Sequence, residues 1–363
     1  MKNRIGKHLQ ELALLPGLSG HEQRVSAYME QEFRSLGLDV LTDTLGNCMA
    51  CIAGSDPKAP VIMVFSHMDS LGFLVKYIEE DGFLRLERLG GIPEKVLPST
   101  PVQIMAKNGQ TFEGVIGVKA HHVTPPEEKY VVDKYQKLYV DIGARSREEV
   151  LELGIDIGSP VVYKPHFQKL LNDRAYLSSS DNRSGCAVIL ELAHEILQKN
   201  VPCTVWLAGT VQEEYNLRGA MVASRTIRPD IAICLDGGGS TDTPDLKGSG
   251  LICVGKGPTM DLYNFHGRGT LNGTIAHPAM VRLAEKTADA LGMQLQRSVH
   301  IGGLTDLSYV QLEGTGVKCL DLGYPGRYAH SPNELVDLND LEALCRLTAA
   351  LIGSINAQTD FSR

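Results

Sequence analysis

Hydrophobic residues along this chain recur at helical spacing in some segments and form short, almost continuous runs in others. Residues 19–37 have the helical spacing, with Ser19 as a candidate N-cap and Gly37 as the end of the helix. Residues 47–54 and 61–69 are runs of strand length, and the second, "VIMVFSHMD", is almost entirely apolar up to its end. Such a run is typical of a strand that is buried on both faces of an α/β sheet.

Beyond residue 165, strand-like and helical segments alternate. The expected strands are 203–211, 230–236 and 316–323, and the expected helices are 182–200, 219–227, 276–292 and 337–355. Alternation of this kind predicts a largely parallel sheet with helices on both faces.

The pattern changes between residues 71 and 164, where short alternating pieces are separated by many Gly and Pro residues. An Asn-Gly pair at Asn108 indicates a turn, and 146–154 has helical spacing. We therefore predict an α/β fold: a mixed, mostly parallel sheet between helices, formed by residues 1–70 and 165–363. A small β-rich insert, residues 71–164, interrupts it.

Polar residues follow three of the expected buried strands at the point where each strand ends. His67 and Asp69 end the first, Glu213 and Glu214 follow the second, and Asp236 ends the third. Ligands bind at the carboxyl edge of open α/β sheets, so these side chains are candidates for one shared site. In an ideal strand, the neighbours Glu213 and Glu214 would point to opposite faces, so the chain must leave strand geometry if both are to reach that site.

Two more candidates join this edge. Asp181 stands at the start of the helix after "SSSDNRSGC", where an N-cap would explain it if it stood alone, and His330 lies in a loop beyond the strand 316–323. Two imidazoles and three carboxylates suit two divalent ions. Their combined charge of +4 would nearly balance −3 from Asp181, Glu214 and Asp236.

The motifs that carry these residues are similar to those of a known family. The sequence resembles, over nearly its whole length, the tetrahedral (TET) and glutamyl aminopeptidase family of dinuclear metallopeptidases. The similar stretches, in the family's order, are "SHMDSLGFLV", "SSSDNRSGC", "TVQEEYNLRGA", "CLDGGG" and "YPGRYAHSP".

The resemblance implies two divalent metal ions per subunit, zinc ahead of cobalt or manganese. His67 and Asp236 would complete one metal site, Glu214 and His330 the other, and Asp181 would bridge the two ions.

The resemblance also assigns two residues to catalysis. Glu213 would be the base that takes a proton from a water between the ions, and Asp69 would orient His67. A water between two ions has a lowered pKa, and a base that moves its proton contributes about 10²–10⁴-fold to the rate.

The chain departs from the family at several positions. Ser70 stands where Glu is usual, Asn182 where Asp is usual, and Asn216 where Gly is usual. Asn tolerates left-handed backbone, so the turn after the glutamates is compatible with Asn216. The run 237–245 departs most, which leaves the preferred substrate open.

Composition and charge narrow the function classes. Apolar residues make up 43% of the 363 and charged residues 21%, and the net charge is −8, which argues against a nucleic-acid partner. No apolar run approaches the roughly 20 residues of a membrane span, and the N-terminal segment lacks the apolar core of a signal peptide.

Eight cysteines, mostly in apolar runs, fit buried thiols and a cytoplasmic protein. The C-x-x-C of Cys48 and Cys51 has no second pair nearby, and the two thiols are expected on opposite faces of a strand.

Three functions remain open. The favoured one is an aminopeptidase acting on peptides. Another dinuclear hydrolase, a deacylase or carboxypeptidase, would use nearly the same ligands, whereas a glycan hydrolase would need a pair of unligated carboxylates and only Glu213 is clearly available. A non-catalytic assembly protein is disfavoured because every site residue is present.

The insert 71–164 carries no candidate ligand, because His121 and His122 lie in a segment that we interpret as a loop. A lid or spacer is one explanation. The resemblance implies the other, a homo-oligomer, most simply a dodecamer built from dimers, in which the insert pairs protomers. The loop 119–130 could then reach toward a neighbour's site.

Overall fold

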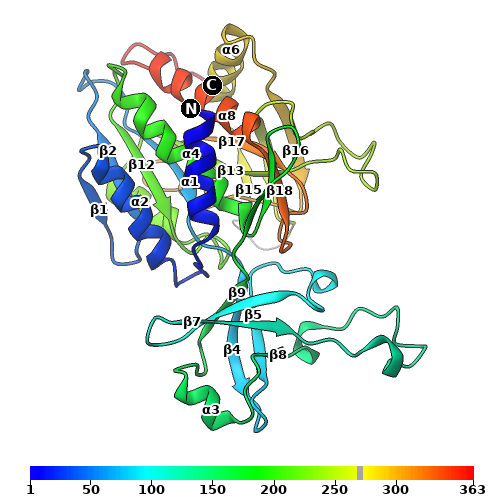
Figure 1. Ribbon diagram of the computed structural model, residues 1–363. Coiled ribbons are helices and arrows are strands. Elements are labelled where there is room, and N and C mark those ends of the chain that lie inside the picture. Colours follow the sequence, from blue (N-terminus) through cyan, green and yellow to red (C-terminus); the bar gives the residue numbers. More distant parts are fainter. Residues whose placement is uncertain (268–272) are drawn as a thin grey trace.

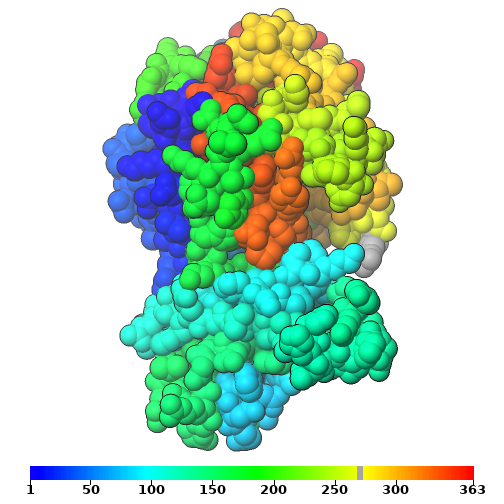
Figure 2. All heavy atoms as spheres, turned by 45° about the vertical axis from the view of Figure 1, so that its right-hand side comes forward, coloured from blue at the N-terminus to red at the C-terminus, as the bar shows by residue number. Residues whose placement is uncertain are grey.

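A computed structural model describes residues 1–267 and 273–363 of the chain. It consists of a large sheet between helices and, below it, a small barrel (Figure 1). In Figure 2 the residues of the insert, coloured cyan to green, form a lobe beneath the rest of the molecule. The predicted fold class, a mostly parallel sheet between helices interrupted by a β-rich insert, is confirmed.

In the described residues the large sheet has nine strands, in the order β1-β2-β12-β3-β13-β17-β14-β15, with β16 paired to β14. These strands are β1 (Val40–Thr42), β2 (Cys48–Ile52), β3 (Ile62–His67), β12 (Val205–Thr210), β13 (Ile231–Gly239), β14 (Thr259–Phe265), β15 (Gly273–Ile275), β16 (Gln296–Ile301) and β17 (Lys318–Gly326). The central strands β12, β3, β13 and β17 are parallel, whereas β2 and β14 flank them in antiparallel pairing. The parallel strands therefore all end at the same edge.

Helices cover both faces of this sheet. They are α1 (Lys2–Ala13), α2 (Gln23–Ser35), α4 (Ser180–Leu197), α6 (Pro278–Ala290) and α8 (Leu338–Ser354) on one face, and α5 (Gly219–Ile227) and α7 (Leu307–Val310) on the other. Successive residues of β3 alternate between the two cores: Ile62 and Val64 pack in the first, Met63 and Phe65 in the second. The apolar run is explained by this burial on both faces.

The insert forms a closed barrel with the strand order β4-β5-β8-β7-β6-β9. Its elements are β4 (Gly72–Ile78), β5 (Leu84–Leu89), η1 (Glu94–Val96), β6 (Pro101–Met105), β7 (Thr111–Ile116), η2 (His121–Val123), η3 (Tyr135–Lys137), β8 (Val140–Asp141), α3 (Arg147–Glu152) and β9 (Pro160–Tyr163). It has its own apolar core, in which Phe73, Leu84 and Val102 are buried. Three more strands form a third sheet, and all of them follow the barrel in the sequence. They are β10 (Phe167–Lys169), β11 (Arg174–Leu177) and β18 (Glu334–Asp337).

One local expectation was wrong, and one helix was missed. Ser19 does not cap a helix: α2 begins only at Gln23, and the Ser19 hydroxyl instead donates a hydrogen bond to Asp69 at 2.5 Å. Helix α1, residues 2–13, was not among the expected elements. By contrast, Gly37 follows the end of α2 with a φ of +80°, as its role as a helix end requires.

Most of the cysteines are buried, as expected from the sequence. All eight cysteines lie in the described part of the chain and are free thiols, with Cys48 buried and Cys51 partly exposed on β2. Among the described helices, none is both long and apolar enough to cross a membrane.

Candidate active site

The carboxyl edge of the parallel strands opens into a cavity of about 900 Å³. Six of the seven candidate residues line it: His67, Asp181, Glu213, Glu214, Asp236 and His330. The seventh, Asp69, is fully buried behind His67. The structure therefore brings all the candidate residues together, although they come from the end of β3, the bend after β12, the interior of β13, the loop after β17 and the start of α4. Asp236 does not end its strand as predicted, because β13 continues to Gly239.

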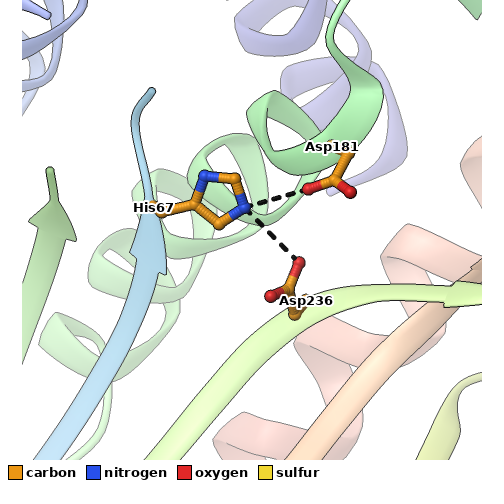
Figure 3. A group of neighbouring side chains, drawn as sticks. All are labelled: His67, Asp181 and Asp236. Atoms are coloured by element: carbon orange, nitrogen blue, oxygen red, sulfur yellow. Dashed lines mark hydrogen bonds and ion pairs between the residues drawn. The ribbon is translucent and has the colours of Figure 1, made fainter. Parts of the chain in front are cut away.

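The first group of side chains consists of His67, Asp181 and Asp236 (Figure 3). They come from β3, α4 and β13 and point toward one another. His67 Nε2 lies 2.9 Å from Asp181 Oδ1 and 3.8 Å from Asp236 Oδ1. One atom from each residue lies within 4.8 Å of the other two, which is close enough to surround a single ion.

The second group consists of Asp181, Glu214 and His330. His330 Nε2 lies 3.6 Å from Asp181 Oδ2 and 3.9 Å from Glu214 Oε1. Asp181 belongs to both groups, and its two oxygens face two different histidines. Among the described residues, the buried Glu214 Oε1 has no hydrogen-bond partner.

Backbone carbonyls fix the orientation of both histidines. His67 Nδ1 lies 3.1 Å from the carbonyl oxygen of Asp69 and 3.4 Å from the Asp69 carboxylate. His330 Nδ1 lies 2.7 Å from the carbonyl oxygen of Gly91, which belongs to the barrel. With Nδ1 engaged in this way, each ring directs Nε2 into the cavity.

The chain leaves strand geometry where the sequence predicted it. Strand β12 ends at Thr210, and Gln212, Asn216 and Leu217 have φ values of +58°, +93° and +59°. This backbone turns both carboxylates of the following glutamates into the cavity. Asn is one of the few residues with a side chain that accept such a φ readily, which explains how Asn216 can stand where the family has Gly.

Burial and crowding of charge shift the acidity of these groups. Burial raises the pKa of Glu213 and of Asp236 well above the usual range, and neighbouring carboxylates add to the effect. Burial likewise raises the pKa of Glu214 to about 7. Burial opposes the shift at Asp181, but hydrogen bonds from His330 and His67 lower its pKa below the usual range.

The pKa values of both histidines are also raised, but by nearby carboxylates and not by burial. Burial would lower the pKa of His330, but Asp181 and Glu214 raise it to about 11. The pKa of His67 rises against burial because Glu213 and Asp181 are close. Excess negative charge in a buried site is thus the dominant electrostatic feature.

Two supporting carboxylates were missed in the sequence. Glu334 accepts the backbone N–H of Asp181 at 2.8 Å and that of His330 at 2.6 Å, so it ties together two elements of the cavity. Glu22 accepts the backbone N–H of Gln212 at 3.2 Å. The available signal for Glu334 was a charged residue four positions after His330, at the start of a buried strand.

Other candidate positions lie away from the cavity. His121 and His122 are exposed in η2, consistent with the expected loop. The hydroxyl of Ser70 donates to the carbonyl of Gly17, and the amide of Asn182 to that of Leu235, so neither departure from the family faces the cavity.

A third cluster of potential ligands, Glu191, His194 and Glu195, lies on α4. Arg4 already binds the Glu191 carboxylate through two hydrogen bonds, at 2.6 and 2.8 Å.

Comparison with known proteins extends over nearly the whole chain. The family model described as M42 glutamyl aminopeptidase matches residues 46–347. SgcX, named as a candidate aminopeptidase of Escherichia coli (strain K12), is 38% identical over 337 residues, which cover 93% of this chain and 90% of that protein. The lysyl aminopeptidase of Pyrococcus furiosus is 31% identical over 342 residues, 93% of each chain.

Solved structures agree with these relatives. The aminopeptidase APDkam598 from Desulfurococcus kamchatkensis has a TM-score of 0.92 at 31% identity, over 98% of this chain and 96% of that one. The TET1 peptidase of Pyrococcus horikoshii, described as able to assemble into a tetrahedron or a large octahedral shell, has a TM-score of 0.84 at 29% identity, over 96% and 99%.

The fold, the cavity and these similarities together define a peptide hydrolase. Within that class, the chain belongs to the M42 glutamyl aminopeptidase family.

Proposed function

We propose that the protein is a dinuclear metal-dependent aminopeptidase, which removes N-terminal residues from peptides. One observation carries the proposal: the two oxygens of Asp181 face His67 and His330 separately, at 2.9 and 3.6 Å. A carboxylate in this position can bridge two ions. Asp236 and Glu214 then supply one further carboxylate on each side.

The donor set fits two divalent cations. Each group offers one imidazole nitrogen, one oxygen of the shared carboxylate and one further carboxylate, a combination that suits zinc, cobalt or manganese. The unpartnered, buried Glu214 Oε1 is the kind of atom that an ion would satisfy. Such ions, when bound, supply Lewis acidity that polarises the scissile carbonyl and acidifies water between them.

Glu213 is the residue that we assign as general base. It lines the cavity but belongs to neither group of potential ligands. Its carboxylate lies 3.9 Å from His67 Nε2, where it would reach a water held between the two groups. From there it would accept a proton from that water and return it to the leaving amine.

Asp69 is the residue that we assign to orientation. Its carboxylate lies beside His67 Nδ1, on the opposite side of the ring from Nε2, which points into the cavity. A carboxylate there holds the imidazole with Nε2 directed at the ion and raises its basicity.

We further propose a homo-oligomer, a dodecamer built from dimers, in which the barrel pairs protomers. The support is the segment between β7 and β8, which extends from the barrel (Figure 1). It exposes large apolar side chains, with Val123, Tyr130 and Val131 exposed to 70, 95 and 61%. Side chains of this kind in one exposed segment are typical of an interaction surface. The free cysteines suit a cytoplasmic location, which is part of the same proposal.

The proposal is tested with metal-depleted protein that is re-supplied with Zn²⁺, Co²⁺ or Mn²⁺ in separate samples. Each is given aminoacyl p-nitroanilides and short peptides, with a free or an acetylated N-terminus. We expect metal-dependent release of the first residue only where the N-terminus is free. Similar rates on acetylated peptides would instead indicate a deacylase or an endopeptidase.

A further inference from the structure

One wall of the cavity is built by β14 and β16, which carry no candidate metal ligand. It places Asp261, Asn264 and His300 at the cavity surface. The Asp261 carboxylate lies mostly inside this wall, since its side chain is only 17% exposed. An acidic group so placed, in the same cavity as the reacting groups but outside both metal groups, needs a chemical explanation.

The partners of Asp261 leave most of its hydrogen-bonding capacity unused. Oδ1 accepts the hydroxyl of Ser298. Among the described residues, Oδ2 has one charged neighbour, His300, whose Nδ1 lies at 3.7 Å, beyond a hydrogen bond. An ionised carboxylate can accept about four hydrogen bonds. No Lys or Arg in the described part of the chain forms an ion pair with it.

A second carboxyl lies beneath Asp261. Asp321 is its direct partner across the β14–β17 ladder, so both side chains face the same side of the sheet. The Asp321 oxygens are occupied, one by the hydroxyl of Thr305 and one by the amide of Asn264, both at 2.8 Å. Burial, together with Asp261, raises the pKa of Asp321 to about 7. The wall therefore offers one carboxyl, Asp321, with a hydrogen bond on each oxygen and, beside it, Asp261, whose Oδ2 accepts none from the described residues.

We propose that Asp261 selects peptides whose N-terminal residue is basic, lysine or arginine. This inference rests on the proposed aminopeptidase function. In such an enzyme, the scissile carbonyl and the α-amino group would lie beside the two groups of potential metal ligands and Glu213. The first side chain then extends into the rest of the same cavity, and its cationic end meets Asp261. The apolar side chains of Ile301 and Leu304, which also line the cavity, can cover the methylene groups of lysine.

Arg218 is the strongest competing feature, because it also lines the cavity and would favour an acidic side chain. Its guanidinium lies over the ring of Tyr215, 4.8 Å from the centroid, and both residues are exposed. Solvent and salt screen an exposed charge far more than a charge at a mostly buried position. Asp261 therefore has a larger effect than Arg218 on which N-terminal side chain the cavity prefers.

Kinetics on p-nitroanilides of lysine, arginine, leucine and glutamate test the inference. We expect kcat/KM for the basic substrates to exceed that for leucine by about tenfold or more, with glutamate lowest. Asp261→Asn should reduce kcat/KM for lysine by about tenfold or more, the size expected for a charge-assisted hydrogen bond, and that for leucine by less than about threefold. Asp39→Asn, the same change at an exposed position, is the matched control and should alter neither.

Binding supplies a readout that does not depend on turnover. In the Glu213→Gln variant loaded with metal, calorimetry should detect L-lysine binding more tightly than L-norleucine, which has the same four side-chain carbons but lacks the ammonium group. Adding Asp261→Asn should abolish that difference. Unchanged metal content and thermal unfolding of Asp261→Asn establish that the variant is folded.

The outcomes separate the inference from the proposed function. If no substrate with a free N-terminus is cleaved, the aminopeptidase proposal fails. Cleavage with a preference for leucine or glutamate, or an Asp261→Asn variant that keeps the lysine preference, overturns this inference alone. Faster hydrolysis of Ala-Lys than of Lys-Ala also overturns it, because Asp261 would then contact the second residue.

Discussion

Asp69 Oδ1 accepts the backbone N–H of Glu213 at 3.0 Å, at the bend where β12 ends. Its other oxygen, Oδ2, accepts the N–H of Glu214 at 3.1 Å and the hydroxyl of Ser19. The same carboxylate lies beside His67 Nδ1. A residue that sequence comparison assigned to one histidine therefore also fixes the turn that directs both glutamates.

The different positions of Asp181 and Asp69 predict different losses of metal. Asp181→Ala should remove both ions, since both groups share its carboxylate. Asp69→Ala should lower metal affinity or activity by only about 10–100-fold, as is typical of a group behind a ligand. Elemental analysis of both purified variants measures this. Equal and near-complete metal loss in the two would mean that Asp69 is itself a ligand.

Glu213→Gln should lower kcat by about 10²–10⁴-fold, the contribution of general acid–base catalysis. Because Glu213 lies in neither metal group, the variant should still bind two ions. Steady-state kinetics and elemental analysis on the same sample check both points. Retained activity, or loss of an ion, would contradict the assignment of Glu213 as base.

Removal of the metals should destabilise the folded protein. Ions that bind only the native state stabilise it by about 2.7 kcal/mol when free metal is at about 100 times Kd. The crowding of buried carboxyl groups in the cavity adds to the effect, because without ions these groups must either hold a proton or carry uncompensated charge. Differential scanning calorimetry with and without chelator should show a lower Tm after chelation. Asp181→Ala serves as the control, and a chelator effect of equal size in it would place the stabilising ions elsewhere.

The candidate site could be predicted because parallel strands end at one edge of a sheet. Once 61–69, 203–211 and 230–236 were interpreted as strands, the positions of His67, Glu214 and Asp236 followed from that geometry. The strand β3 was recognisable because burial on both faces leaves it almost no polar residue.

The supporting shell could not be predicted in the same way. Glu22 and Glu334 act through backbone N–H groups of distant residues, and such contacts leave no pattern in side-chain spacing. Ser19 has the sequence signature of an N-cap, yet its hydroxyl binds Asp69, since tertiary contact outweighs local preference here. The order of the strands in the barrel could not be predicted from the sequence either, because it depends on pairing between strands that are far apart in the chain.

Assembly should depend on the exposed apolar residues between β7 and β8. We expect light scattering at micromolar concentration to give a mass far above 39.5 kDa. Replacing Val123, Tyr130 and Val131 with Lys should lower that mass without lowering the Tm of the subunit, because all three side chains are exposed. Lys at Leu251, which is also exposed but is not part of the barrel, is a suitable control. A wild-type monomer with full activity would remove the oligomer proposal.

The final prediction concerns Glu22, which is 4% exposed and lies behind the glutamate turn. Its Oε1 accepts the N–H groups of Gly20 and Gln212 at 2.7 and 3.2 Å. Three successive N–H groups, those of Gln212, Glu213 and Glu214, therefore end on two carboxyl groups, Glu22 and Asp69. Glu22 is thus a positioning residue for the base, although it touches no metal group.

Glu22→Ala should lower kcat while KM and metal content stay close to wild type, because it releases one anchor of the turn without removing a ligand. Glu22→Gln retains an acceptor oxygen and should restore most of the activity.

The two variants should also differ from the wild type in the pH dependence of their stability. Burial, aided by Asp69, raises the pKa of Glu22 from 4.5 to about 7, so the folded state favours the protonated form. Wild-type stability should therefore fall relative to Glu22→Gln as pH rises from about 4.5 to about 7, where the unfolded chain has already released the proton. Thermal unfolding across that range measures the difference. A constant difference, or metal loss in Glu22→Ala, would show that Glu22 does not act through the turn.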